Sequence, residues 1–192
     1  MTDDRKEELI ERHRDINANH DWWDAVYEDF DIICKCMGID VDKGEPCFSG
    51  FCSQGDGASF TGTFNGEVAE NAPEEIRKHA PLDKKLHRIA DELCMLGRLY
   101  YRAYAHISRL YGTNYYHQYT MFITGLEPMY GDADDWADAV HALVEDGLQD
   151  LFRDLAGWLY SSLDVEYDYL TSDEAVWDTI VANDLHKEEE YA

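Results

Sequence analysis

Apolar side chains recur every three or four residues along most of this chain, which is the spacing of helices with one buried face. The pattern predicts helices over residues 3–17, 73–80, 83–110, 132–163 and 171–181, and one that starts from an N-cap at Asn19 or Asp21 and runs to residue 37. Asp83 and either Thr171 or Ser172 are predicted N-caps, and Gly38 a C-terminal stop. In the helix over 132–163, the predicted core stripe is Trp136, Val140, Leu143, Val144, Gly147, Leu151, Leu155, Trp158 and Leu159.

The pattern changes between the second and third helices. Residues 46–54 and 58–64 are predicted strands, and Gly55-Asp56-Gly57 between them is a turn sequence that supplies positive φ. Residues 114–124, rich in aromatic and β-branched side chains, are predicted as a third strand. We therefore expect an α+β fold, in which a small antiparallel sheet (the hairpin plus the third strand) is packed by several helices and a long acidic C-terminal helix follows.

We expect one domain over residues 1–192, with a frayed tail over 187–192. The N-terminus shows no apolar signal segment, and no apolar run approaches the roughly 18 residues that a membrane span needs. The five cysteines are an odd number, so we expect free thiols. These features favour a soluble cytoplasmic protein.

Charge is the dominant compositional feature, because 41 Asp and Glu face 16 Lys and Arg for a net charge of -25. Residues 127–192 hold 19 of these acids and only two bases, Arg153 and Lys187. Such a chain repels nucleic acid and anionic membranes, and it attracts basic proteins. The acidic excess serves either solubility alone or recognition of a basic partner.

No residue set predicts a metal site, a cofactor site or a catalytic site. Cys34, Cys36, Cys47 and Cys52 fall within nineteen residues, but they lack the C-x-x-C pairs typical of zinc sites. Ser49 is not in a G-x-S-x-G motif, and the glycines around Asp56 lack the spacing of a phosphate-binding loop. We therefore expect a protein that is not an enzyme and has no cofactor.

Two surfaces are candidates for binding a partner. An acidic face on and after the helix over 132–163 is predicted from Asp135, Asp138, Glu145, Asp146, Asp150, Asp154, Asp164, Glu166 and Asp168. A rigid display of this kind can imitate a nucleic acid for a protein with a basic groove; the alternative is a solvated helix face. An aromatic interface is predicted from Tyr101, Tyr104, Tyr115 and Tyr116.

Residues 48–62 read FSGFCSQGDGASFTG. This segment resembles a family of small acidic phage- and prophage-encoded proteins with the signature F-S-G-F-x-S-Q-G-D-G-A-x-F-x-G. The resemblance continues at residues 19–23, 115–117 and 170–176. It implies an accessory phage gene of mostly unassigned, sometimes antitoxin-like, function, and it transfers no catalytic residue. The signature hairpin itself remains a candidate site, through Ser49, Phe51, Ser53, Gln54, Asp56 and Phe60.

Three functional hypotheses follow. The first is a phage-encoded inhibitor that binds a host nucleic-acid-binding defence protein, of the CRISPR or restriction type, through the acidic face. The second is an antitoxin-like or regulatory protein that binds one specific partner through the aromatic interface. The third is a small-ligand protein or enzyme that uses the hairpin at residues 48–62.

Overall fold

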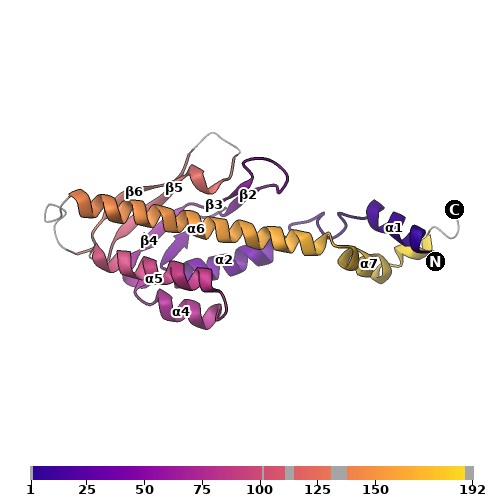
Figure 1. The fold of residues 1–192 in the computed structure, drawn as a ribbon, viewed down its shortest axis with the longest axis horizontal. Helices are drawn as coiled ribbons and strands as arrows, with labels where there is room; N and C mark the ends of the chain where they lie inside the picture. Colours follow the sequence, from indigo (N-terminus) through magenta and orange to yellow (C-terminus); the bar gives the residue numbers. More distant parts are fainter. Residues whose placement is uncertain (1, 101, 111–114, 131–137, 189–192) are drawn as a thin grey trace. The chain divides into compact units, whose positions relative to one another are not determined.

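The computed structural model describes residues 2–100, 102–110, 115–130 and 138–188 (Figure 1). The chain divides into two compact units. We call Tyr27–Tyr160 the sheet unit, and Met1–Val26 together with Ser161–Ala192 the terminal unit. Helices α2 (Asp24–Cys36) and α6 (Asp138–Leu170) each contribute residues to both units.

The sheet unit is built on a four-stranded antiparallel sheet with the strand order β1-β4-β5-β6. Its strands are β1 (Ile39–Val41), β4 (Gly62–Asn65), β5 (Tyr104–Arg109) and β6 (Met121–Glu127). Along β5 the side chains alternate, with Ala105 and Ile107 buried and His106 exposed. One face of the sheet therefore belongs to the core, and the other reaches solvent.

Helices cover the buried face of this sheet. Phe152 of α6 packs against Phe64 of β4, with ring centroids 5.5 Å apart. Helix α5 (Lys84–Leu99) lies beside α6 (Figure 1). The carboxylate of Asp83 accepts hydrogen bonds from the Leu86 backbone N–H at 2.9 Å and from the Trp158 indole N–H at 2.7 Å. The predicted N-cap is thus confirmed, and the same carboxylate joins the start of α5 to α6.

The rest of the sheet unit consists of a separate hairpin and short helices. Strands β2 (Cys47–Ser49) and β3 (Gly57–Ser59) form a two-stranded antiparallel sheet. The short elements are α3 (Gly66–Ala69), α4 (Ala72–His79) and the 3-10 helix η1 (Gln118–Thr120).

In its described residues, the terminal unit consists of helices joined by turns. It contains α1 (Asp3–Arg12), α7 (Asp173–Ala182), α8 (Leu185–Glu188) and parts of α2 and α6. Its buried cluster consists of Leu9, Ile10, Val176 and Ile180. The Asn17 side-chain amide donates to the Leu170 carbonyl at 3.0 Å, and its oxygen accepts from the Thr179 hydroxyl at 2.8 Å.

The predicted α+β class is confirmed, together with the long C-terminal helix, but several elements differ from the prediction. The helix predicted over 83–110 is wrong beyond Leu99. Arg102 adopts a φ of 59°, and its backbone N–H donates to the Gly97 carbonyl, which ends the helix. Residues 104–109 then form β5, because the alternation of small or apolar with polar side chains suits a strand paired on both sides.

The predicted three-stranded sheet is also corrected. The strand predicted over 58–64 is two strands in different sheets, β3 and β4, with the fully buried Phe60 between them. The strand predicted over 114–124 is β6, which begins at Met121 and pairs with β5 rather than with the hairpin. Strand β1 and helices α3 and α8 were not predicted.

Helix boundaries shift as well. Helix α1 ends at Arg12 rather than residue 17, and α2 begins at Asp24 rather than directly after Asn19 or Asp21. In the described residues α6 runs from Asp138 to Leu170, beyond the predicted end at 163. Trp136 of the predicted core stripe lies outside the described residues, as do residues 189–192 of the predicted tail. Leu143 was predicted in the core but is 61% exposed.

Candidate functional site

The half of the predicted acidic face that lies in the sheet unit is partly compensated by cations. Asp138, Glu145, Asp146, Asp150 and Asp154 lie on α6, whereas Asp135 lies outside the described residues. Asp154 pairs with Arg88 of α5, and Asp150 lies 3.7 Å from Arg153. Two of these five carboxylates are therefore paired with arginines.

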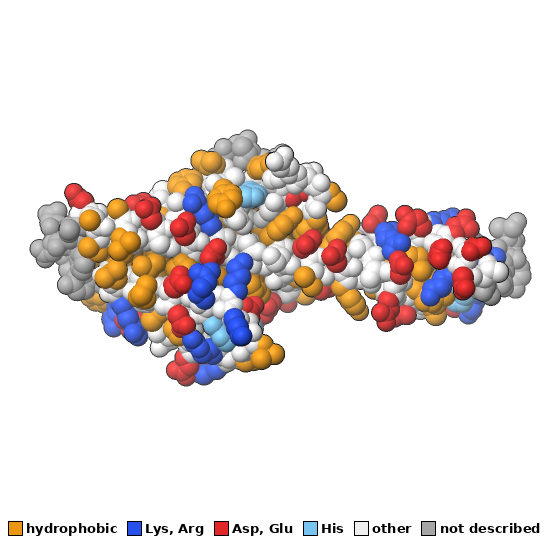
Figure 2. Space-filling model, in the orientation of Figure 1, with side chains coloured by type: hydrophobic (Ala, Val, Ile, Leu, Met, Phe, Trp, Pro, Cys, Tyr) orange, Lys and Arg blue, Asp and Glu red, His pale blue; other side chains and the backbone are white. Residues whose placement is uncertain are grey.

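The other half of the face lies in the terminal unit. Asp164 and Asp168 are four residues apart on α6 and share one side of the helix, whereas Glu166 is turned about 200° from Asp164. The terminal unit carries 18 acids against 5 bases, a net charge of -13 on less than a third of the chain. The sheet unit carries 23 acids against 11 bases, a net charge of -12 on more than twice that length of chain. Figure 2 shows Asp and Glu side chains crowded over the helices of the terminal unit.

The signature hairpin is held by its own polar groups. The Asp56 carboxylate accepts hydrogen bonds from the backbone N–H groups of Cys52 at 2.9 Å and Ser53 at 2.6 Å. Gly55 adopts a φ of 100°, a conformation that a glycine takes at no steric cost. The connection between β2 and β3 thus spans residues 50–56 and is longer than the predicted turn.

Residues 115–117 pack against this loop and form hydrogen bonds with the hairpin. The Tyr115 hydroxyl donates to the Gln54 carbonyl at 3.0 Å, and the Ser49 hydroxyl donates to the Tyr116 carbonyl at 3.1 Å. The Ser49 oxygen also accepts from the Gly57 N–H at 3.3 Å. The structure therefore brings the hairpin loop and residues 115–117 together, and Ser49 holds the two segments to each other.

Aromatic rings complete the support of the hairpin. Phe51 stacks on Tyr160 of α6, with ring centroids 5.4 Å apart, and the Tyr160 hydroxyl donates to the Gly50 carbonyl. Phe60 is fully buried against Phe30, so it is a core residue. The side chains of Cys52, Ser53 and Gln54 are exposed at the loop. The hydroxyl of Ser49 and the carboxylate of Asp56 are thus occupied with loop structure.

The predicted aromatic interface is divided. Tyr104 lies on the solvent-facing side of β5 beside His106, whereas Tyr115 and Tyr116 lie at the hairpin. Tyr101 lies outside the described residues. The prediction that placed Tyr101 and Tyr104 on one helix is wrong, because residues 104–109 form a strand.

An ion pair that was not predicted ties the hairpin sheet to the main sheet. Arg109 of β5 and Glu45 form a bidentate pair at 2.9 and 2.8 Å, and their side chains are only 19% and 10% exposed. The Arg109 guanidinium also donates to the buried Ser59 hydroxyl and lies 4.7 Å from the Tyr116 ring centroid. Breaking such a pair leaves a poorly solvated charge, which is strongly destabilising.

The cysteines are free thiols in the structure. Burial raises the pKa of Cys34, and the charge of Asp31 adds to this shift. Burial likewise raises the pKa of Cys47. Metal ligation requires the thiolate, which these environments disfavour at neutral pH. Among the described residues, no group of three or more His, Cys, Asp or Glu side chains is arranged to hold a metal ion.

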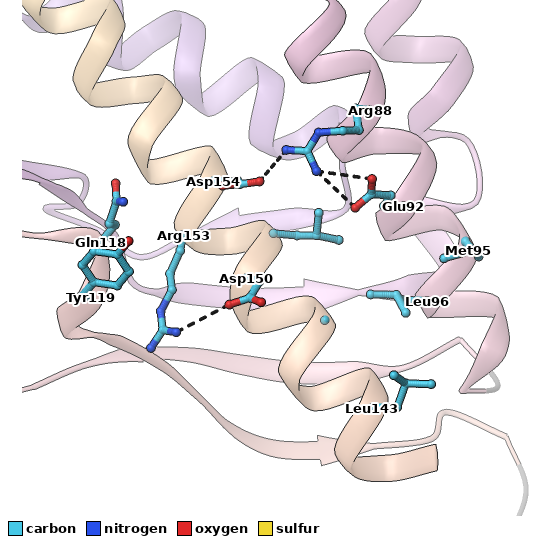
Figure 3. A pocket seen from close by; sticks show the side chains of 12 residues that line it. Arg88, Glu92, Met95, Leu96, Gln118, Tyr119, Leu143, Asp150, Arg153 and Asp154 are labelled. Atoms are coloured by element: carbon cyan, nitrogen blue, oxygen red, sulfur yellow. Dashed lines mark hydrogen bonds and ion pairs between the residues drawn. The ribbon is translucent and has the colours of Figure 1, made fainter. Parts of the chain in front are cut away.

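A groove that was not predicted lies between α5 and α6. It has a volume of about 520 Å³, and η1 contributes Gln118 and Tyr119 to its lining (Figure 3). Leu96 of α5 and Leu143 of α6 project into the space between the two helices. The groove was not predicted because Leu143 was assigned to the core. Gly147 was the one signal in the sequence, since a glycine within a helix allows a neighbouring side chain to pack closely.

One family model matches this chain, over residues 22–173, and its description is a domain of unknown function, DUF8835. The chain belongs to this family. The DUF8835 match covers the whole sheet unit, whereas α1 and all of α7 after its first residue lie outside the matched range. No curated protein matches the chain, and no solved structure does.

The match supports no function for the DUF8835 chain. None of the helices in the described part of the chain has the length and hydrophobicity that a bilayer crossing requires.

Proposed function

We propose that this protein is a non-enzymatic inhibitor that binds a nucleic-acid-binding protein through the acidic surface of the terminal unit. The observation that carries the proposal is the concentration of charge: the terminal unit has a net charge of -13 on less than a third of the chain. This charge comes from 18 acidic and 5 basic side chains.

The described helices of the terminal unit hold part of these carboxylates in a fixed arrangement. Asp164 and Asp168 are about 6 Å apart along the axis of α6. Glu174 lies in the first turn of α7, whereas Asp173 next to it is paired with Arg14. Fixed negative charges at this spacing attract the Lys and Arg side chains that line a nucleic-acid groove. The sheet unit supports the proposal less strongly, because it spreads nearly the same net charge over more than twice the length of chain.

The resemblance of residues 48–62 to phage-encoded proteins suggests the setting. In that setting the partner is a basic nuclease or effector complex of a CRISPR or restriction system. The protein then acts in the cytoplasm of the bacterial host cell, without touching nucleic acid or membrane itself.

The test is salt-dependent binding to purified defence nucleases and effector complexes. We expect a complex at about 0.1 M salt that weakens by about a factor of ten or more at 0.5 M, because many screened charge contacts supply the affinity. The double variant Asp164→Asn/Asp168→Asn should weaken this complex, whereas Asp138→Asn/Asp146→Asn in the sheet unit should change it less. A complex of equal affinity at both salt concentrations would contradict the proposal.

A second candidate function is binding of one specific partner through an apolar surface, as an antitoxin-like or regulatory protein does. The predicted aromatic interface does not favour this function, because Tyr104 lies on β5 whereas Tyr115 and Tyr116 lie at the hairpin. The function is favoured instead by exposed apolar side chains on α5 and α6, chiefly Met95, Leu99 and Leu143.

A further inference from the structure

The groove between α5 and α6 combines apolar and charged surface within the sheet unit. Met95 is 59% exposed and Leu143 is 61% exposed, while Leu96 between them is only 8% exposed. Figure 2 shows hydrophobic side chains gathered over these two helices. Single exposed apolar residues are common on protein surfaces and need no explanation. A cluster of them on neighbouring helices is unusual and indicates an interaction site.

A glycine shapes the floor of this groove. A Cβ atom at Gly147 would lie 2.8 Å from the Leu96 Cδ1 atom, so the absence of a side chain lets α6 approach Leu96 closely. Leu143 stands one helical turn before Gly147, and Leu151 one turn after it. The groove therefore presents an apolar floor with Leu143 as a projecting side chain at its edge.

The other end of the groove is charged, and its arginines already have partners. Arg88 contacts both Glu92 and Asp154, and Arg153 contacts Asp150 (Figure 3). The lining thus holds three carboxylates and two guanidinium groups. Asp146 lies one turn before Asp150 on the same side of α6 and adds a further carboxylate beside the groove. The net charge around the groove is negative, which selects a cationic occupant.

We infer that this groove binds a short amphipathic segment of a partner protein, in which apolar anchor residues are flanked by Lys or Arg. The apolar anchors pack on Leu96, Leu143 and Met95, and the flanking cations face the carboxylates of α6. A second copy of this chain fits less well, because each copy has a net charge of -25 and like charges repel. The inference rests on the second candidate function and is independent of the acidic terminal unit.

The test is a selection from a random peptide library against the full-length protein, followed by affinity measurements on the enriched peptides. We expect the enriched peptides to share apolar residues flanked by Lys or Arg. Leu143→Ser and Met95→Ser should each weaken binding by about tenfold, because each removes apolar contact area without changing charge. Leu82→Ser is the matched control, since Leu82 is 91% exposed and lies outside the groove, and it should leave binding unchanged.

Several results would overturn the inference: no enrichment, enrichment without basic residues, or equal affinity for the wild type and Leu143→Ser. Sedimentation would overturn it in another way, by showing a dimer that Leu143→Ser dissociates, since the groove would then bind a second copy. The Asp164→Asn/Asp168→Asn variant separates the two proposals. It should keep its peptide affinity even where it no longer binds a nuclease, so that failure of one proposal leaves the other standing.

Discussion

The sheet unit and the terminal unit carry almost equal net charge on very different amounts of structure. The sheet unit distributes a net charge of -12 over more than two thirds of the chain. Both units pair some of their acids locally, for example Asp154 with Arg88 in the sheet unit and Asp173 with Arg14 in the terminal unit. The terminal unit places -13 on the remaining, much shorter part, around a cluster of four fully or nearly buried side chains. Charge of this density is tolerated on a small unit only at a cost in stability, because like charges repel in the folded state.

The largest expected effect lies in the sheet unit. Phe64 is fully buried and packs against Phe152, so Phe64→Ala should lower the free energy of unfolding by about 3–5 kcal/mol. Urea unfolding followed by circular dichroism measures this loss. Val68→Ala, at an exposed position on α3, is the control and should change little. A loss below about 1 kcal/mol for Phe64→Ala would mean that Phe64 and Phe152 do not form a tightly packed core.

A smaller and local effect is expected in the terminal unit. Ile180 is fully buried in the four-residue cluster, so Ile180→Ala should cost about 2 kcal/mol, the lower end for such changes. Hydrogen exchange should show faster exchange in α1 and α7, with α5 and the main sheet unchanged. Val181→Ala, next in sequence but 42% exposed, is the matched control. Equal acceleration across both units would show that they unfold together.

Asn17 tests the polar connection inside the terminal unit. Asn17→Ala removes its hydrogen bonds with Leu170 and Thr179, at about 1 kcal/mol for each bond. The expected signature is faster amide exchange in α7. Asn183→Ala is a useful contrast, since its amide bonds only within the last turn, to the Thr179 carbonyl. If amide exchange in α7 is the same in both variants, the hydrogen bonds of Asn17 do not stabilise the connection between Leu170 and α7.

Ionic strength should have the smallest effect and should separate the units most clearly. Raising salt from about 0.05 to 0.5 M shortens the screening length from about 14 to about 4 Å and weakens repulsion among exposed carboxylates. Amide protection in α7 should therefore rise with salt, while protection in β4 and β5 stays nearly constant. A uniform response of both units would mean that charge density does not distinguish them.

The sequence predicted the parts of the fold that local chemistry determines. The caps at Asp83 and Ser172, the stop at Gly38 and the existence of a hairpin all follow from short-range preferences, and the structure confirms them. The assignment of residues 104–109 to a helix failed because β5 is stabilised by strands on both sides, and one of them, β4, is distant in sequence. Tertiary pairing overrode a helical pattern that was plausible by itself.

The candidate surfaces were predictable only as residue types. The acids from Asp138 to Asp154 were predicted on a helix and lie on α6, whereas Asp164, Glu166 and Asp168 were predicted to follow that helix and are part of it. Nothing in the sequence places Arg88 opposite Asp154, 66 residues away. The groove was missed for a related reason. Leu143 fits a core stripe at its spacing, and only the packing of α5 beside α6 shows that this side chain remains exposed.

The contact between Gly57 and His117 makes the residue type allowed at one position depend on the residue type at the other. A Cβ atom at Gly57 would lie 2.8 Å from the His117 Cδ2 atom, so the imidazole occupies the place of a methyl group. A relative with alanine at position 57 needs a smaller side chain at position 117, or a shift of residues 115–117 away from the hairpin. Relatives of this chain should therefore show paired substitutions at these two sites, which an alignment of diverged DUF8835 sequences would reveal as covariation.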